Sequence, residues 1–168
     1  MAKVVLISIR PGWVEMILDG EKTLELRKTR PKVEPPFKCY IYCTLGRGNA
    51  FGEAFGGLVV GEFVCDRIES VWGSGYLKIP ESAFAGSCLN MYQIDTYLDG
   101  KDGYFWHISN LEIYDTPKEL TEFYTWKKCK SCSKSGYEST ACTYDENCIV
   151  PAVITKTPQS WCYVEELK

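Results

Sequence analysis

The apolar residues of this chain fall in short runs, and these runs restrict the elements that it can form. Val4 to Ile9 combines β-branched and other apolar residues, and Phe37 to Thr44 and Leu58 to Cys65 contain aromatic residues as well. A Gly or Pro lies close to each run. Runs of this length and composition, bounded by such breakers, are typical of buried β-strands. No run approaches the roughly 18 apolar residues that a membrane-spanning helix needs, so no membrane contact is expected.

Shorter patterns complete the predicted set of elements. Proline suits the first turn of a helix, so a helix is expected from Pro11 to a stop at Gly20, and another is expected at Met91 to Leu98. The remaining expected elements are strands at Thr23 to Arg27, Tyr104 to Ile108, Leu111 to Tyr114 and Trp161 to Val164, an irregular connection at Gly46 to Gly57, and a turn into a short helix at Asp115 to Leu120. Five or six short strands with two or three short helices, and no regular strand–helix alternation, predict an α+β barrel.

Charge and cysteine content bear on partners and compartment. The net charge is −3, but residues 1–38 carry eight basic and five acidic side chains, and residues 127–134 carry four lysines and no acid. A polyanion would bind these two regions if the fold brought them together, and solvated surface is the alternative. The nine cysteines are odd in number and no export signal precedes them, so a cytoplasmic protein with reduced thiols or metal ligands is expected.

The segment Gly20 to Lys28 carries the strongest chemical signal. Lys22 lies just before the predicted strand, and Glu25 and Arg27 project from one face of it because side chains alternate along a strand. A carboxylate beside two cations stays ionised, since nearby positive charge favours its charged form. From these residues alone, the group is either a functional cluster or a local salt-bridge network, and an exposed network would stabilise by only about 0–1 kcal/mol.

The pattern G-x-K-x-x-E-x-R in this segment, after a strand and a short helix, closely resembles the signature of the ASCH family. Ile7 to Pro11 resembles that family's first strand and turn, Leu58 to Phe63 a later strand, and Tyr104 to Ile108 its aromatic strand. The ending Pro158 to Tyr163 looks like that of a bacterial and phage subgroup with a cysteine-rich extension. The resemblance implies a small PUA-like β-barrel with a few short helices over residues 1–125, a cysteine-rich insertion at 126–150, and a C-terminal strand at 151–168 that packs on the barrel.

The resemblance also implies a cleft that holds RNA or a nucleotide-like ligand. Lys22 would then act as a point charge toward phosphate, Arg27 as a bidentate donor, and Glu25 as an acceptor for a base amino group or a partner that orients Arg27. Tyr42 and Trp106 would stack on a base, or else belong to the core. The ligand-binding residues expected on this reading are Arg10, Lys22, Glu25, Arg27, Arg30, Tyr42 and Trp106.

An enzymatic function is the alternative that the resemblance offers. Some ASCH proteins similar to this chain around the motif are acetylcytidine amidohydrolases that use a lysine, a threonine and a glutamate, and others have been proposed as ribonucleases. Lys22 matches the lysine, but Glu25 stands where the threonine falls, and Thr23 should face differently. The sequence therefore leans away from an enzyme; a hydrolase on nucleosides or RNA would use Lys22 and Glu25 as its catalytic residues.

Four cysteines follow within the predicted insertion. Cys129 and Cys132 form a C-x2-C pair that suits tetrahedral zinc, whereas Cys142 and Cys148 follow at gaps of nine and five residues and do not form the usual second pair. The prediction is one structural zinc ion on these four thiols and no organic cofactor, with free thiols or disulfides as alternatives. The same extension offers a third function, a protein-interaction module that docks a partner.

Overall fold

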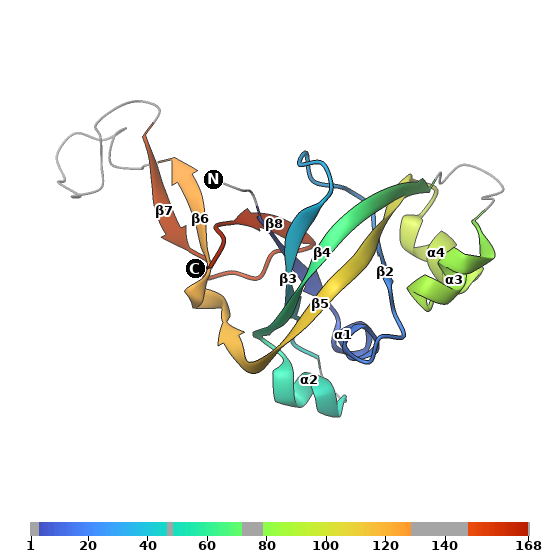
Figure 1. Ribbon diagram of the computed structural model, residues 1–168, viewed down its shortest axis with the longest axis horizontal. Coiled ribbons are helices and arrows are strands. Elements are labelled where there is room, and N and C mark those ends of the chain that lie inside the picture. Colours follow the sequence, from blue (N-terminus) through green and yellow to red (C-terminus); the bar gives the residue numbers. More distant parts are fainter. Residues whose placement is uncertain (1–3, 47–48, 72–78, 129–147, 168) are drawn as a thin grey trace.

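The structure is a computed structural model, and it describes residues 4–46, 49–71, 79–128 and 148–167 (Figure 1). A six-stranded sheet dominates it, with the strand order β2-β5-β4-β3-β1-β8. β1 runs parallel to β3, and every other pair of neighbours in this sheet is antiparallel. The strands are β1 (Val4–Ile9), β2 (Leu24–Arg27), β3 (Phe37–Cys43), β4 (Leu58–Val71), β5 (Gly103–Glu119) and β8 (Trp161–Val164).

The predicted α+β class is confirmed, with one correction to the shape of the sheet. β2 and β8 stand at its two edges, and no backbone ladder joins them within the described part of the chain. The sheet is therefore not closed into a barrel. The long strands β4 and β5 pair over most of their length with three shifts of register, and such irregularities bend and twist a sheet.

The helices are short and lie outside the sheet (Figure 1). α1 (Pro11–Leu18) and α4 (Met91–Leu98) occur where they were predicted. α3 (Glu81–Ser87) was not predicted, and α2 (Ala50–Phe55) occupies part of the expected irregular connection, where the Asn49 side chain caps it by accepting a hydrogen bond from the Gly52 amide at 2.9 Å. No described helix is long and apolar enough to cross a membrane.

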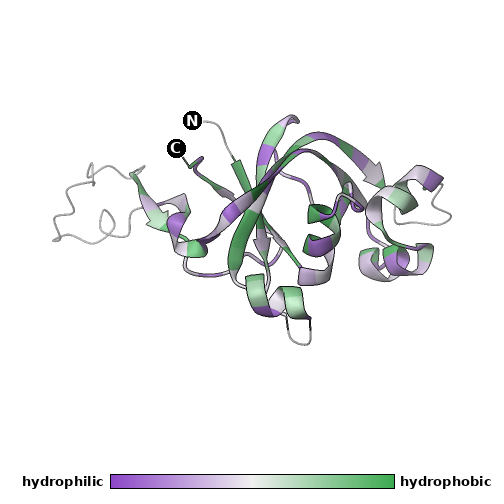
Figure 2. Ribbon diagram, turned by 60° about the horizontal axis from the view of Figure 1, so that its bottom comes forward, coloured by the Kyte–Doolittle hydropathy of each residue, from purple (hydrophilic) through white to green (hydrophobic). Residues whose placement is uncertain are grey.

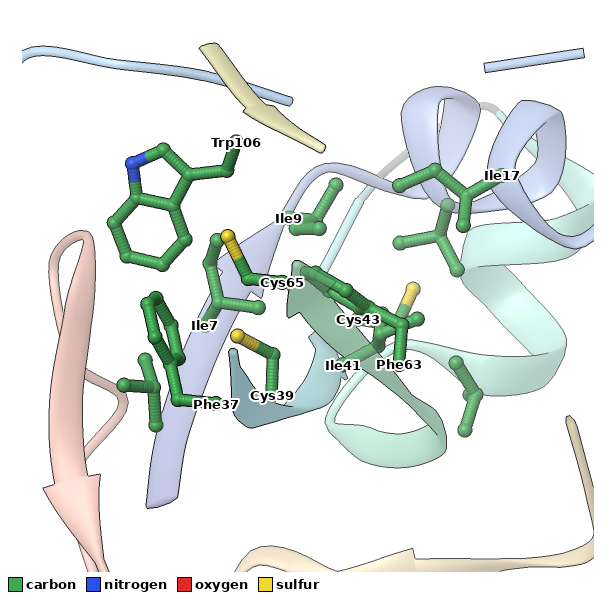
Figure 3. Packing of buried hydrophobic residues seen from close by; sticks show 13 residues of the cluster. Ile7, Ile9, Ile17, Phe37, Cys39, Ile41, Cys43, Phe63, Cys65 and Trp106 are labelled. Carbon is green, nitrogen blue, oxygen red and sulfur yellow. The ribbon is translucent and has the colours of Figure 1, made fainter. Parts of the chain in front are cut away.

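Apolar side chains cover both faces of β1, and this explains its unbroken apolar sequence. On one face, Ile7 and Ile9 pack in a cluster with Phe37 and Trp106 (Figure 3). On the other face, Leu6 packs in a second cluster with residues that include Tyr40 and Phe123. In Figure 2, β1 is coloured as hydrophobic along most of its length.

β5 and the segment after it differ from the prediction. The two strands expected at Tyr104 to Ile108 and Leu111 to Tyr114 form one strand, which passes through Asn110 at a φ of 46°. The turn expected from Asp115 is part of the same strand, and the short helix is the 3-10 turn η1 (Leu120–Glu122). Pairing with β4 provides hydrogen-bond partners for this segment, and these outweigh its local turn preference.

A separate hairpin follows η1. β6 (Tyr124–Lys128) and β7 (Ile149–Val153) form a two-stranded antiparallel sheet that stands apart from the six-stranded sheet (Figure 1). Residues 129–147, between the two strands, lie outside the described part of the chain. β8 then pairs antiparallel with β1, and the amide of Glu165 after it donates to the Tyr124 carbonyl oxygen at 2.8 Å.

Candidate functional site

A cavity of about 560 Å³ opens beside β2, and we call it the β2 cavity. β1 and the turn after it contribute Ser8, Ile9 and Arg10, and α1 contributes Trp13. The segment that ends in β2 contributes Lys22, Glu25, Leu26 and Arg27, α4 contributes Tyr92, Gln93, Thr96 and Tyr97, and the segment before β8 contributes Gln159 and Ser160; Thr44 and Leu89 complete the lining. The cavity therefore collects side chains from both ends of the chain.

Three charged side chains lie together in the β2 cavity, and we call Lys22, Glu25 and Arg27 the charged cluster. Glu25 Oε1 lies 2.9 Å from the Arg27 guanidinium, and Glu25 Oε2 lies 3.5 Å from Lys22 Nζ. Their exposed fractions are 2%, 6% and 7% in sequence order, so all three are buried. Burying charges is costly unless they are paired and hydrogen-bonded. All three charges are paired, and Arg27 Nε is the one buried polar atom of the cluster for which the described residues provide no hydrogen-bond partner.

Backbone carbonyl groups hold both cations in place. Lys22 Nζ donates a hydrogen bond of 2.6 Å to the carbonyl oxygen of Ser87, the last residue of α3. The Arg27 guanidinium donates to the carbonyl oxygen of Ser8 at 2.6 Å and to Ser160 Oγ at 3.4 Å. These contacts tie β2 to α3, to β1 and to the segment before β8, so the charged cluster is fixed by three parts of the fold.

The electrostatics of the cavity follow from this burial. Burial lowers the pKa of Lys22 below its ordinary value of 10.5, and the Glu25 carboxylate opposes that change. Burial likewise raises the pKa of Tyr97, against the opposing effect of Arg27. Lys22 Nζ also lies 5.1 Å from the centroid of the Trp13 ring, within cation–π range. With both cations protonated, the charged cluster carries a net charge of +1, and the exposed Arg10 adds another.

The other residues predicted to bind a ligand lie elsewhere. Arg30 is on the surface and pairs with Glu34 at 2.8 Å. Tyr42 is buried, and its hydroxyl lies 3.0 Å from Thr157 Oγ1. Trp106 is fully buried and meets the Phe37 ring edge to face at a centroid distance of 5.7 Å, as a core residue would. Arg30, Tyr42 and Trp106 do not line the β2 cavity, and neither does the exposed Thr23.

Sequence reasoning missed the wall that α4 contributes. Ile94 and Leu98 of this helix are buried, whereas Tyr92 is 77% exposed at the cavity. An exposed aromatic residue on the polar face of a short helix was a usable signal. Gln159 and Ser160 gave no comparable signal, because they reach the cavity only through the pairing of β8 with β1.

The predicted zinc site lies almost wholly outside the described residues. Cys129, Cys132 and Cys142 fall in the segment 129–147, and Cys148 is buried just before β7 (Ile149–Val153). One structural zinc on these four thiols therefore stays a proposal, and metal analysis of the purified full chain tests it. Protein docking through the same extension also depends on residues beyond the described ones.

Comparison with known proteins identifies the fold. No protein-family model and no curated protein matches this chain. Among solved structures, the ASCH protein of Zymomonas mobilis covers 70% of this chain and 74% of its own, with 20% identity and a TM-score of 0.53. A tyrosine-to-phenylalanine variant of that protein covers 70% of this chain and 76% of its own, with 19% identity and a TM-score of 0.53.

A serine-to-alanine variant of the Zymomonas mobilis protein aligns over more of the chain. It covers 98% of this chain and 89% of its own, with 16% identity and a TM-score of 0.60. The chain therefore has the ASCH fold, as the G-x-K-x-x-E-x-R segment predicted. At these identities the likeness establishes the fold alone, and the ligand has to be argued from this chain's own cavity.

Proposed function

We propose that this protein binds single-stranded RNA by taking one nucleotide into the β2 cavity. The observation that carries the proposal is the buried charged cluster in a cavity of about 560 Å³, a size typical of small-ligand sites. The cavity combines a net positive charge with aromatic and amide side chains. Single-stranded nucleic acids are recognised by this combination of cations, aromatic rings and polar groups.

Each part of a nucleotide has a suitable partner in the cavity. The Glu25 carboxylate has accepting capacity beyond its two ion pairs and would accept a hydrogen bond from a base amino group. Tyr92 offers an exposed ring for stacking. Arg10 is exposed at the cavity and suits the phosphate, because a solvated cation there keeps its charge without the cost of burial.

A titration of labelled single-stranded RNA at several salt concentrations tests the proposal. Arg10→Ala should weaken binding and reduce the slope of log affinity against log salt by about one, as expected for one lost phosphate contact. Arg30→Ala is the matched control, since Arg30 is also exposed but does not line the cavity. Tyr92→Ala should weaken binding by roughly tenfold with little change in that slope. Equal affinities for the Arg10 and Arg30 variants and for the wild type would contradict the proposal.

Hydrolysis of a nucleoside or RNA is the second candidate, and the lowered pKa of Lys22 favours it. A lysine amine that loses its proton more easily serves as a base or nucleophile. Against it, Glu25 is the one carboxylate among the cavity's described lining residues, and it is already paired with two cations. Incubation with acylated nucleosides and with RNA, followed by product analysis, separates the candidates. Turnover by the wild type that Lys22→Met abolishes would favour the hydrolase.

A further inference from the structure

The β6–β7 hairpin exposes an apolar face that neither the core nor the β2 cavity uses. Residues directly opposite each other in an antiparallel pair point to the same face, and Tyr124 pairs with Val153, Trp126 with Pro151 and Lys128 with Ile149. We call these six residues the hairpin face. All six are exposed, with Tyr124 at 42% and Trp126 at 39%. An isolated two-stranded hairpin gains little stability from an apolar face in water, so this composition points to binding.

We propose that the hairpin face is a second binding site for single-stranded nucleic acid, on which Tyr124 and Trp126 each stack one base. The two residues alternate on one strand and stand roughly 7 Å apart along it. Aromatic residues presented in this way by a sheet are a known means of stacking bases of single-stranded RNA. The inference takes its ligand class from the proposed function, but it rests on a separate set of residues.

The hairpin is also preorganised for stacking. The indole N–H of Trp126 donates to the Glu165 carboxylate, which fixes the ring from one edge and leaves its faces to be covered. The amide of Glu165 in turn donates to the Tyr124 carbonyl oxygen at 2.8 Å, so the segment after β8 braces β6. A ring that is already held in place loses less conformational entropy when a base stacks on it.

The positive charge of the described residues of β6 and β7 favours a polyanion as the ligand of the hairpin face. Lys128 lies on the hairpin face and Lys127 on the opposite face of β6, both exposed, and the described residues of β6 and β7 include no acidic side chain, although the whole chain has a net charge of −3. The Glu165 carboxylate beside this face is already paired with the Trp126 indole. A second copy of this chain would bring a second Lys128 to the same contact, and like charges would then face each other. A nucleic acid instead supplies planar bases for the rings and phosphates for the lysines.

Binding of a trinucleotide and of a dodecamer of single-stranded RNA to the full-length protein tests this inference. Trp126→Ala and Tyr124→Ala should each weaken dodecamer binding by roughly tenfold and leave trinucleotide binding in the β2 cavity unchanged. Trp126→Phe, which keeps a ring, should recover most of the affinity. Ile113→Ala, which removes an exposed apolar side chain from β5, is the matched control and should change neither. Circular dichroism of each variant verifies folding.

The outcomes separate the two sites. If the dodecamer binds no more tightly than the trinucleotide, or if Trp126→Ala matches Ile113→Ala, the hairpin site is wrong and the β2 cavity stands. If the hairpin variants lose dodecamer binding while Arg10→Ala and Tyr92→Ala retain it, the hairpin site stands and the β2 cavity is wrong as an RNA site. If these variants instead abolish self-association in sedimentation experiments with RNA affinity unchanged, the hairpin face is an interface between copies of the chain.

Discussion

The Arg27 guanidinium on β2 donates a hydrogen bond of 2.6 Å to the carbonyl oxygen of Ser8 on β1. These strands are not neighbours in the sheet, because β5, β4 and β3 stand between them. The contact therefore bridges the opening that a closed barrel would fill with backbone hydrogen bonds. The same guanidinium pairs with Glu25 at 2.9 Å, so one side chain both links the edge strand β2 to β1, the neighbour of the other edge strand, and completes the charged cluster.

Replacing Arg27 should destabilise the fold strongly. Arg27→Met removes the bridge to Ser8 and the closer of the two cations that pair with the buried Glu25. Breaking a buried ion pair from one side typically costs about 3–5 kcal/mol, and here the buried Glu25 keeps the more distant Lys22, at 3.5 Å, as its remaining cation. Urea unfolding should show a loss of that order in the free energy of unfolding.

A surface pair of the same kind is the control for this prediction. Arg30 and Glu34 lie 2.8 Å apart, but their side chains are 39% and 72% exposed. Arg30→Ala should therefore cost only about 0–1 kcal/mol. The double variant Arg27→Met/Glu25→Gln should be more stable than the sum of the single changes predicts, because each single change loses the Arg27–Glu25 interaction and the double variant loses it only once. Additive effects would contradict the account of the charged cluster.

Substitution of alanine for glycine should change the free energy of unfolding in opposite directions at Gly61 and Gly12. A Cβ at Gly61 would lie 2.5 Å from the Glu112 carbonyl oxygen of β5, where backbone rather than a flexible side chain has to move. Gly61→Ala should therefore lower the free energy of unfolding by about 1–3 kcal/mol. At Gly12 in α1, such a Cβ would have no atom within 4 Å apart from the backbone of the same helix and the two neighbouring residues, so Gly12→Ala should raise the free energy of unfolding by about 0.5–1 kcal/mol. Thermal and urea unfolding of both variants give the comparison, and the same sign for both would contradict it.

The sequence predicted best the features that depend on neighbouring residues. α4 occurs at Met91–Leu98 as expected, where Asn90 caps the first turn and Asp99 ends the helix. The charged cluster spans six positions, so strand alternation sufficed to place Glu25 and Arg27 on one face. The β5 segment was predicted less well, because its pairing with β4 continues through Asn110, a residue whose conformation locally resembles a turn.

The rest of the cavity depends on tertiary packing, which the sequence does not display. Tyr97 and Gln159 are distant in sequence and meet at the β2 cavity because α4 packs beside β2 and because β8 pairs with β1. Tyr42 and Trp106 were expected either to stack on a ligand or to belong to the core, and both are buried. An aromatic side chain on a strand carries the same signal in the core and at a binding site, so only burial separates the two.

The core cysteines should be protected from alkylation until the protein unfolds. Burial raises the pKa of Cys43 to about 11 and that of Cys65 to about 12, so both remain thiols near neutral pH. Cys88, at the end of α3, is only half-buried. With iodoacetamide at about pH 8, peptide mapping should show Cys88 labelled well before Cys65. The labelling rate of Cys65 should rise with urea in step with global unfolding, and rapid labelling of Cys65 in the native protein would contradict its placement.

The buried Lys22 should make stability increase with pH in the alkaline range. Its pKa is lowered by burial in the folded protein, so between that pKa and 10.5 the unfolded chain binds more protons than the folded one. The free energy of unfolding rises with pH wherever this holds, and Lys22→Met removes the contribution. The difference in unfolding free energy between the wild type and Lys22→Met should therefore grow in favour of the wild type as pH approaches 10.5.

Lys38 is the matched comparison, because its pKa is shifted in the opposite direction from that of Lys22. Its hydrogen bond to Glu62, at 2.7 Å, raises the pKa of Lys38, so its contribution is fully present below 10.5 and is lost only as pH rises through the folded value. Urea unfolding from about pH 7 to about pH 10 should therefore show a constant difference between the wild type and Lys38→Met, beside a growing difference for Lys22→Met. The same pH dependence of these differences for both variants would mean that Lys22 is solvated. The charged cluster would then not be buried in the β2 cavity as the proposed ligand site requires.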